Sequence, residues 1–341
     1  MKTKFGTSYF GNRARQHVRK DLEEMVQLGF NYVVHTFSEN DWRYYEKSMA
    51  EIVADSKELG LEVIMDPWGV GGVFGGEAFS QLVFKDPTLS QVMANGNRAP
   101  SCCFNNSNFR DEIKSWIVSC ERMNADGILW DEPHWYIPSW YERSDSEDGT
   151  CVCHCKHCET KYFDKYGELL PQELTENFTE FLDSSLFEFI DWATAETKLH
   201  NMKNLVCLIP NEAYSSGIQD WEKIISLPQV DTFGTDPYWL CHKQPMGPYV
   251  SDYAVKVRNL CEKYGKEAQL WVQAFSIPDG HEEEVGMATK ILLDHGIENI
   301  GFWGFKACNA MSKLRPDNPE KVWSQVTGAI ESLNKYSNGA H

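Results

Sequence analysis

The chain has 341 residues and a formal net charge of −18 at pH 7. So negative a surface excludes nucleic acids and anionic membranes as natural partners, and it favours neutral or cationic ligands. Hydrophobic residues make up 42% of the chain, and no apolar run is long enough to span a membrane. This predicts a soluble, cytoplasmic protein with a large core, and it leaves a homo-oligomer open.

Apolar runs of strand length alternate with amphipathic stretches along the chain. The first two runs, residues 5–10 and 31–36, flank a segment in which Val18, Leu22 and Met25 recur at helical spacing. Strands that alternate with helices pair in parallel, so eight such units predict an α/β protein, a single (β/α)8 TIM barrel over residues 1–341. An open doubly wound sheet is the rival, but no glycine-rich phosphate-binding turn follows the first strand. The other six runs are residues 62–66, 127–131, 205–210, 232–236, 270–275 and 300–305.

Two long insertions interrupt this alternation. One covers residues 69–107, after the third strand, and the other covers residues 133–170, after the fourth. Both follow the carboxyl ends of strands, which is the face of a barrel on which binding and catalytic sites are built. We therefore expect the site to lie at this face.

The second insertion is rich in cysteine. Residues 151–158 read CVCHCKHC, and Cys102 and Cys103 stand in the first insertion. Eleven cysteines are an odd number in a chain too large to need disulfides, which favours free thiols with a metal cluster. Several close thiols and one distant thiol can form a tetrahedral zinc site, which would be structural and would join the two insertions. The spacing C-x3-C-x2-C also occurs in radical-SAM iron–sulfur enzymes, but there it normally follows the first strand.

Polar and aromatic residues follow the carboxyl end of each predicted strand. Aromatic faces stack on the C–H surfaces of sugars, and carboxylates and amides bind hydroxyl groups, so this rim predicts a pocket for a polar, ring-shaped ligand. The alternative is that the rings fill the barrel mouth and the acids lie in solvated loops. The residues expected to bind a carbohydrate substrate are His35, Asp66, Trp68, His134, Trp135, Glu212, Tyr238, Gln273, Trp303 and Lys306.

Some of these residues have an equally ordinary structural interpretation. His35 and His134 could bind a sugar hydroxyl or orient a carboxylate, but a lone histidine is often structural. Glu212 could be a loop acid or a helix cap. We expect Lys306 to neutralise the nearby carboxylates rather than to bind an acidic sugar.

The stretch DGILWDEPHWY, residues 126–136, ends a buried strand with two adjacent carboxylates. Desolvated carboxylates repel one another, so packing alone does not explain Asp131 and Glu132. Glycoside cleavage requires one protonated carboxyl that donates to the leaving oxygen and a second that attacks the anomeric carbon or activates water. Asp131, Glu132 and Asp236 are therefore the predicted catalytic residues. A metal-dependent barrel isomerase or hydrolase and a non-catalytic sugar-binding barrel are the alternatives.

Three stretches resemble glycoside hydrolase family 42, the zinc-containing bacterial beta-galactosidases, and related clan-A hydrolase barrels. They are VRKDLEEMVQLGFNYVVHTFSEND, CCFNNSNFRDEI and CHCKHCETKYFDKYG. WDEP resembles the Asn-Glu pair that ends the clan's fourth strand, which implies that Glu132 is the acid/base, and DPYW resembles the family's Asp-x-Tyr after strand six. The resemblance also implies a structural zinc ion on Cys103, Cys153, Cys155 and Cys158.

Two positions depart from the clan's pattern. The clan's Asn is Asp131 here, and its nucleophilic Glu at the end of strand seven is Gln273, which cannot be a nucleophile of that kind. A second carboxylate must therefore come from elsewhere. DGILWDEP also resembles barrels of other clans, whose nucleophile is an Asp on strand four and whose acid/base is an Asp on strand six. That pattern assigns these roles to Asp131 and Asp236.

Overall fold

The eight predicted strands close into a parallel barrel. The computed structural model describes residues 3–141, 152–210 and 216–338, and in this part of the chain the strand order around the barrel is β1-β10-β9-β8-β7-β6-β3-β2. All neighbouring barrel strands are parallel, so the predicted α/β TIM barrel is confirmed. The barrel strands are β1 (Lys4–Tyr9), β2 (Tyr32–Thr36), β3 (Glu62–Asp66), β6 (Gly127–Asp131), β7 (Lys203–Leu208), β8 (Thr232–Thr235), β9 (Glu267–Gln273) and β10 (Asn299–Trp303), and β4 (Ser90–Val92) and β5 (Arg98–Cys102) form a separate hairpin.

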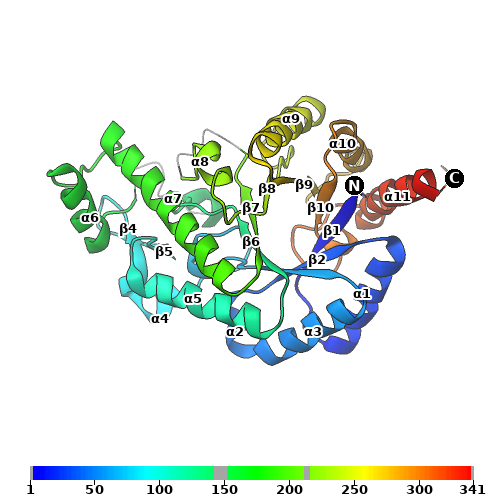
Figure 1. Cartoon of the computed structure of the whole chain (residues 1–341), viewed down its shortest axis with the longest axis horizontal. Coiled ribbons are helices and arrows are strands. Elements are labelled where there is room, and N and C mark those ends of the chain that lie inside the picture. Colours follow the sequence, from blue (N-terminus) through cyan, green and yellow to red (C-terminus); the bar gives the residue numbers. More distant parts are fainter. Residues whose placement is uncertain (1–2, 142–151, 211–215, 339–341) are drawn as a thin grey trace.

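Helices surround the outside of the barrel (Figure 1). The repeat that predicted the first helix is its buried face, since Val18, Leu22 and Met25 are shielded from solvent. This helix ends at Gly29, whose φ of 95° suits a residue without a Cβ atom. None of the described helices has both the length and the apolar character that a membrane crossing requires. The helices are α1 (Arg15–Leu28), α2 (Glu39–Tyr44), α3 (Glu46–Glu58), α4 (Leu82–Lys85), α5 (Ser107–Arg122), α6 (Lys156–Tyr166), α7 (Glu176–Leu199), α8 (Trp221–Ile225), α9 (Met246–Tyr264), α10 (Glu283–Asp294) and α11 (Pro319–Asn338).

The alternation of side chains along the strands divides the core in two. Every second residue of a strand points into the barrel, where Ile64 and Leu129 belong to one apolar cluster. The residues between them point outward and pack beneath the helices in a second, larger cluster. The same alternation directs Asp66, two residues after Ile64, and Asp131, two residues after Leu129, into the mouth of the barrel.

The two insertions contact each other. Met93, which follows β4, forms an antiparallel bridge with Val152 of the second insertion. The N–H of His154 donates to the carbonyl oxygen of Val92 over 2.7 Å. Figure 1 shows that the hairpin and α6 lie at the opposite end of the molecule from α11. The insertions therefore extend the barrel on one side only.

Candidate active site and metal centre

The end of β6 places Asp131 in the barrel mouth. Asp131 is only 7% exposed, and the loop after β3 covers it, because the N–H of Gly75 donates to the Asp131 carbonyl oxygen over 3.0 Å. A Cβ atom at Gly75 would lie 2.5 Å from Oδ2 of Asp131 and 3.0 Å from Oε2 of Glu132. A glycine is therefore needed for this loop to close over the two carboxyls.

Glu132 leaves the strand in a conformation that residues with a side chain rarely adopt. Its φ is 42°, and its N–H donates to the carbonyl oxygen of Cys207 on β7 over 2.9 Å. Such a conformation costs roughly 1–3 kcal/mol and is concentrated at functional sites. The carboxyls of Glu132 and of Asp236, which follows β8, lie close enough to shift each other's pKa. Two buried carboxyls that interact in this way share a proton more readily than both ionise.

Burial raises the pKa of four carboxyls in the barrel mouth, those of Asp66, Asp131, Glu132 and Asp236. Desolvation is the main cause for each, and neighbouring carboxylates raise the pKa of every one except Asp131 further. The pKa of Asp131 rises to about 7 and that of Glu132 to about 8, whereas that of Asp236 lies well above its usual range. The carboxyls of the mouth therefore titrate as one interacting group, which keeps a proton to higher pH than free carboxyls do.

Asp66, at the end of β3, is fully buried and lacks hydrogen-bond partners. Neither of its carboxyl oxygens, nor Oδ1 of Asp236, accepts a hydrogen bond from a described residue. A buried acceptor without a partner costs about 1–3 kcal/mol. Such atoms are positions at which a bound ligand could supply the missing donor.

Aromatic rings line the mouth beside these acids. Phe10, which follows β1, packs against Trp68 and Trp303, with ring centroids 5.5 and 5.9 Å away. Tyr238 packs edge-on against Phe275 at 5.0 Å. Burial and the nearby carboxylates raise the pKa of the Tyr238 hydroxyl. Apolar ring faces next to hydrogen-bonding groups are the surroundings that a sugar ring requires.

Two further residues of this region were not predicted from the sequence. Cys207 stands opposite Asp131 in the register of β6 and β7, and burial together with the nearby carboxylates raises the pKa of its thiol. Tyr249, on α9, has a buried hydroxyl without a partner, and burial, together with Asp236 and Glu132, raises its pKa. The strand register could have identified Cys207, because β7 lies between β6 and β8. No local signal marks Tyr249, since only the folded barrel brings α9 to the site.

The structure places three predicted substrate-binding residues away from the mouth. His35 points outward from β2, where Nε2 lies 2.9 Å from a serine hydroxyl of α3. Trp135 is buried, and its Nε1–H donates to a backbone carbonyl of α7 over 3.1 Å. Lys306 forms ion pairs with two acidic residues of α1, the nearer at 2.7 Å, and so does not neutralise the carboxyls as expected. The alternation along β2 explains His35, because Val34 beside it points inward.

Two other predicted residues bond to the protein at the mouth. The Gln273 amide accepts from one backbone N–H and donates to one backbone carbonyl, each over 3.1 Å. His134 is buried, its Nδ1–H donates to the Glu132 carbonyl oxygen over 2.5 Å, and its ring packs against Trp140. Burial lowers the pKa of His134 to about 4, so this ring is neutral at pH 7. Glu212 lies outside the described residues.

The predicted cysteine ligands form one buried cluster. The Sγ atoms of Cys103, Cys153, Cys155 and Cys158 lie within 4.8 Å of one another. Sγ of Cys103 is 3.4 Å from Sγ of both Cys155 and Cys158. A tetrahedral zinc site with Zn–S bonds of about 2.3 Å has S···S separations of about 3.8 Å, so the cluster has the size of such a site. Cys151, of the alternative iron–sulfur spacing, lies outside the described residues.

Polar groups surround the sulfur atoms. The N–H of Val92 donates to Sγ of Cys153 over 3.4 Å. The side-chain amide of Asn105 donates to Sγ of Cys158 over 3.3 Å, and Lys161 in turn donates to the Asn105 oxygen over 2.8 Å. Donors directed at sulfur stabilise thiolates, which are the form that binds metal. This donor set fits a closed four-thiolate metal site that ties the end of β5 to the start of α6.

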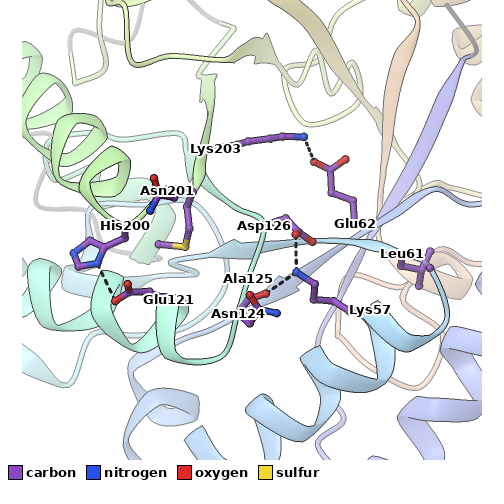
Figure 2. A pocket seen from close by; sticks show the side chains of 12 residues that line it. Lys57, Leu61, Glu62, Glu121, Asn124, Ala125, Asp126, His200, Asn201 and Lys203 are labelled. Atoms are coloured by element: carbon purple, nitrogen blue, oxygen red, sulfur yellow. Dashed lines mark hydrogen bonds and ion pairs between the residues drawn. The ribbon is translucent and has the colours of Figure 1, made fainter.

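A separate cleft lies at the amino ends of β3, β6 and β7, away from the carboxyl ends that carry the acids (Figure 2). Its volume is about 640 Å³. Lys57 pairs with Asp126 at 2.7 Å, and Lys203 pairs with Glu62 at 2.6 Å. These charged side chains are paired with each other, and we propose no binding or catalytic role for the cleft.

No protein-family model and no curated protein matches the chain. Solved structures with a similar fold include the catalytic domain of beta-amylase from Paenibacillus polymyxa, at 11% identity and a TM-score of 0.66, with 96% of this chain and 98% of that chain covered. The endo-1,4-beta-mannanase from Rhizomucor miehei has 12% identity and a TM-score of 0.65, with 98% and 95% covered. An exo-beta-1,4-mannosidase from Opitutaceae bacterium strain TAV5 has 11% identity and a TM-score of 0.58, with 98% and 60% covered. At such identities the likeness establishes the barrel fold and no family.

Proposed function

We propose that the chain is a glycoside hydrolase that cleaves a small or oligomeric sugar in the barrel mouth. The observation that carries this proposal is the group of three interacting carboxyls at the ends of β6 and β8, in which Asp131 and Asp236 are buried and Glu132 is half-buried. Glycoside cleavage requires one protonated and one ionised carboxyl, and this group provides both. Several of the solved structures with a similar fold are glycosidases, which supports the same proposal.

Position and burial suggest the roles. Asp131 stands where the resemblance to other clans places the nucleophile, so it is the proposed nucleophile or general base. Burial raises the pKa of both Glu132 and Asp236, so this pair should hold a proton to higher pH than free carboxyls do and is the proposed general acid. The proton belongs to the pair, because strongly interacting carboxyls titrate together.

Asp66, Trp68, Tyr238 and Trp303 are the proposed substrate contacts. They combine unsatisfied or polar groups with aromatic faces in the same mouth. His134 is proposed to act indirectly, because its bond to the Glu132 backbone holds that residue in its left-handed conformation.

The test compares Asp131→Asn, Glu132→Gln and Asp236→Asn on an activated aryl glycoside and on a sugar with a poor leaving group. A general-acid variant should lose far less activity on the activated substrate, because that leaving group scarcely needs a proton. Asp131→Asn should lose at least about a thousandfold in kcat on both substrates. Glu121→Gln, at the amino ends of the strands, is the control and should keep parental activity.

Retention of activity within about tenfold by all three variants would exclude this site as the catalytic centre. A non-catalytic sugar-binding barrel is the second candidate. The observation that favours it is Gln273, which replaces the clan's nucleophile and is bonded to the backbone. That candidate predicts sugar binding by calorimetry without turnover of any aryl glycoside.

We also propose that the four-cysteine cluster binds one structural zinc ion. The four sulfur atoms have the spacing of a tetrahedral thiolate site, and no position is left open for a substrate. Elemental analysis should find about one zinc per chain. Iron with acid-labile sulfide, or no metal, would contradict this assignment.

A further inference from the structure

The barrel mouth contains more acid than the proposed hydrolysis requires. Asp66 stands on β3 beside β6, and it is close enough to Asp131 and Glu132 for their charges to raise its pKa. No described residue donates a hydrogen bond to it, and it has no part in the proton transfer proposed above. Its burial without a partner needs another explanation.

The basic residues that the structure places around the barrel rim have other partners. Lys306 is paired with α1. Arg13 forms a two-pronged pair with Asp41, at 2.8 and 2.9 Å, and also donates to the Thr36 carbonyl. Within the described residues, burial and neighbouring acids set the pKa of Asp66, and no lysine or arginine offsets them. A positive charge for Asp66 would therefore have to come from the ligand.

A metal ion fits this region less well than an organic cation. Within the described ranges, the four cysteines are the one set of three or more metal-binding side chains whose donor atoms lie within 4.8 Å of one another. The described carboxyls of the mouth do not form a second set of this kind. Trp68 lies beside them, with a buried Nε1–H that has no partner. Aromatic faces attract ammonium groups, whereas a divalent ion requires a close shell of oxygen atoms.

We infer that the sugar recognised in this mouth carries a protonated amine, and that Asp66 is the residue that selects it. The inference rests on the proposed function for the sugar but not on turnover. The substrate class is an amino sugar with a free amine, whose ammonium group donates to the unpartnered oxygens of Asp66. Acetylation of the amine removes both the charge and two of its three donors, so an N-acetylated sugar loses this contact.

The experiment measures binding by calorimetry at pH 7 with two matched sets of probes. The first compares protonated tris(hydroxymethyl)aminomethane with pentaerythritol, which has a hydroxymethyl group in place of the ammonium group. The second compares methyl 2-amino- and 6-amino-glycosides of glucose, galactose and mannose with their hydroxyl and acetamido counterparts. The amine should bind at least about tenfold more tightly in the first set and in at least one sugar pair, as an additional buried charge-assisted bond predicts.

Asp66→Asn should remove this preference, so that each amine and its neutral counterpart bind equally, and Glu121→Gln should leave the preference unchanged. Equal binding of amine and neutral probes, or a preference that survives Asp66→Asn, would overturn the inference. Displacement of the amines by micromolar Mg²⁺ or Ca²⁺ would overturn it too, because it would make the site a metal site. These outcomes are independent of the hydrolysis test, since a protein that hydrolyses aryl glycosides could still fail to prefer amines.

Discussion

At the scale of single residues, the site contains groups whose backbone conformation or surroundings are energetically unfavourable. Glu132 keeps a left-handed backbone, and Asp66 is buried without a hydrogen-bond partner among the described residues. Both features lower the free energy of unfolding, and neither improves the packing of the core. Unfavourable residues of this kind are typical of functional sites, so their replacement should raise the stability of the protein and lower its activity.

Asp66→Asn is therefore expected to stabilise the protein in a pH-dependent way. The pKa of Asp66 is raised in the folded state, so the folded protein binds more protons than the unfolded chain, and stability falls as pH rises above about 4. The variant should exceed the parent by about 1–3 kcal/mol at pH 8 and by little near pH 4. Urea unfolding at both pH values measures the difference.

Asp126→Asn serves as the contrasting control for this change. Asp126 accepts hydrogen bonds from Lys57 and from the Val63 backbone, so its amide variant should be less stable than the parent at pH 8. If Asp66→Asn lowered the free energy of unfolding at pH 8 as much as Asp126→Asn does, Asp66 would have a hydrogen-bond partner in solution. The assignment of Asp66 as an unpaired acid would then be wrong.

Gly75→Ala should damage the site without disturbing the barrel. The new methyl group would lie 2.5 Å from Asp131 Oδ2, closer than carbon and oxygen approach, so the loop or both carboxyls must shift. A displacement of this size at reacting groups costs about a hundredfold in kcat/KM. Steady-state kinetics on an aryl glycoside measures it. Gly247→Ala, where a Cβ atom meets nothing within 4 Å, is the matched control, and similar activity of the two variants would show that the loop yields freely.

At the scale of elements, the cysteine cluster joins segments that have few other ties. The β4–β5 hairpin and the start of α6 meet through the bridge of Met93 with Val152, the bond of His154 to Val92, and the four sulfur atoms. Neither segment belongs to the closed barrel. A metal ion here would hold the insertions to each other rather than hold the barrel together.

Removal of the metal should therefore loosen the insertions selectively. After chelation, or in Cys155→Ser, amide hydrogen exchange should increase in residues 88–105 and 152–166, whereas the barrel strands should stay protected. The reason is that local opening requires only the loss of the contacts of that segment. Cys241→Ser, which changes an exposed cysteine outside the cluster, is the control. Cooperative loss of protection in all strands would contradict a local role.

At the scale of the whole molecule, the charge of −18 sets the response to salt. Like charges on a compact surface repel one another and destabilise the folded state, and salt screens this repulsion. An increase from about 10 mM to 100 mM NaCl shortens the screening length from about 30 Å to about 10 Å. We expect the free energy of unfolding at pH 8 to rise by about 1 kcal/mol over this range.

Chemical denaturation with urea, an uncharged denaturant, measures this effect. The same series near pH 5, where the net charge of the chain is close to zero, is the control and should show little dependence on salt. An equal response at both pH values would mean that salt acts through specific ion binding rather than through the net charge.

The sequence by itself determined the features that depend on neighbours along the chain. The alternation of apolar runs with helical repeats identified the barrel, and the burial of Val18, Leu22 and Met25 follows from their spacing. The position of the Asp131 carboxyl at a strand end was also visible in the sequence. Periodicity and strand ends are local properties, because backbone hydrogen bonding repeats over a few residues whatever the remainder of the chain does.

The tertiary structure decided which of the candidate side chains meet. His35 stands one residue before the end of β2, whereas Asp66 ends β3, so the alternation along the strands directs the first toward a helix and the second into the mouth. Lys306 forms an ion pair with an acidic residue of α1, and no sequence motif connects the two positions. Tyr249 lies on a helix, and the fold brings it near the carboxyls of the site. Barrel closure fixes the register between strands that are far apart in sequence, and these contacts exist only once that register is set.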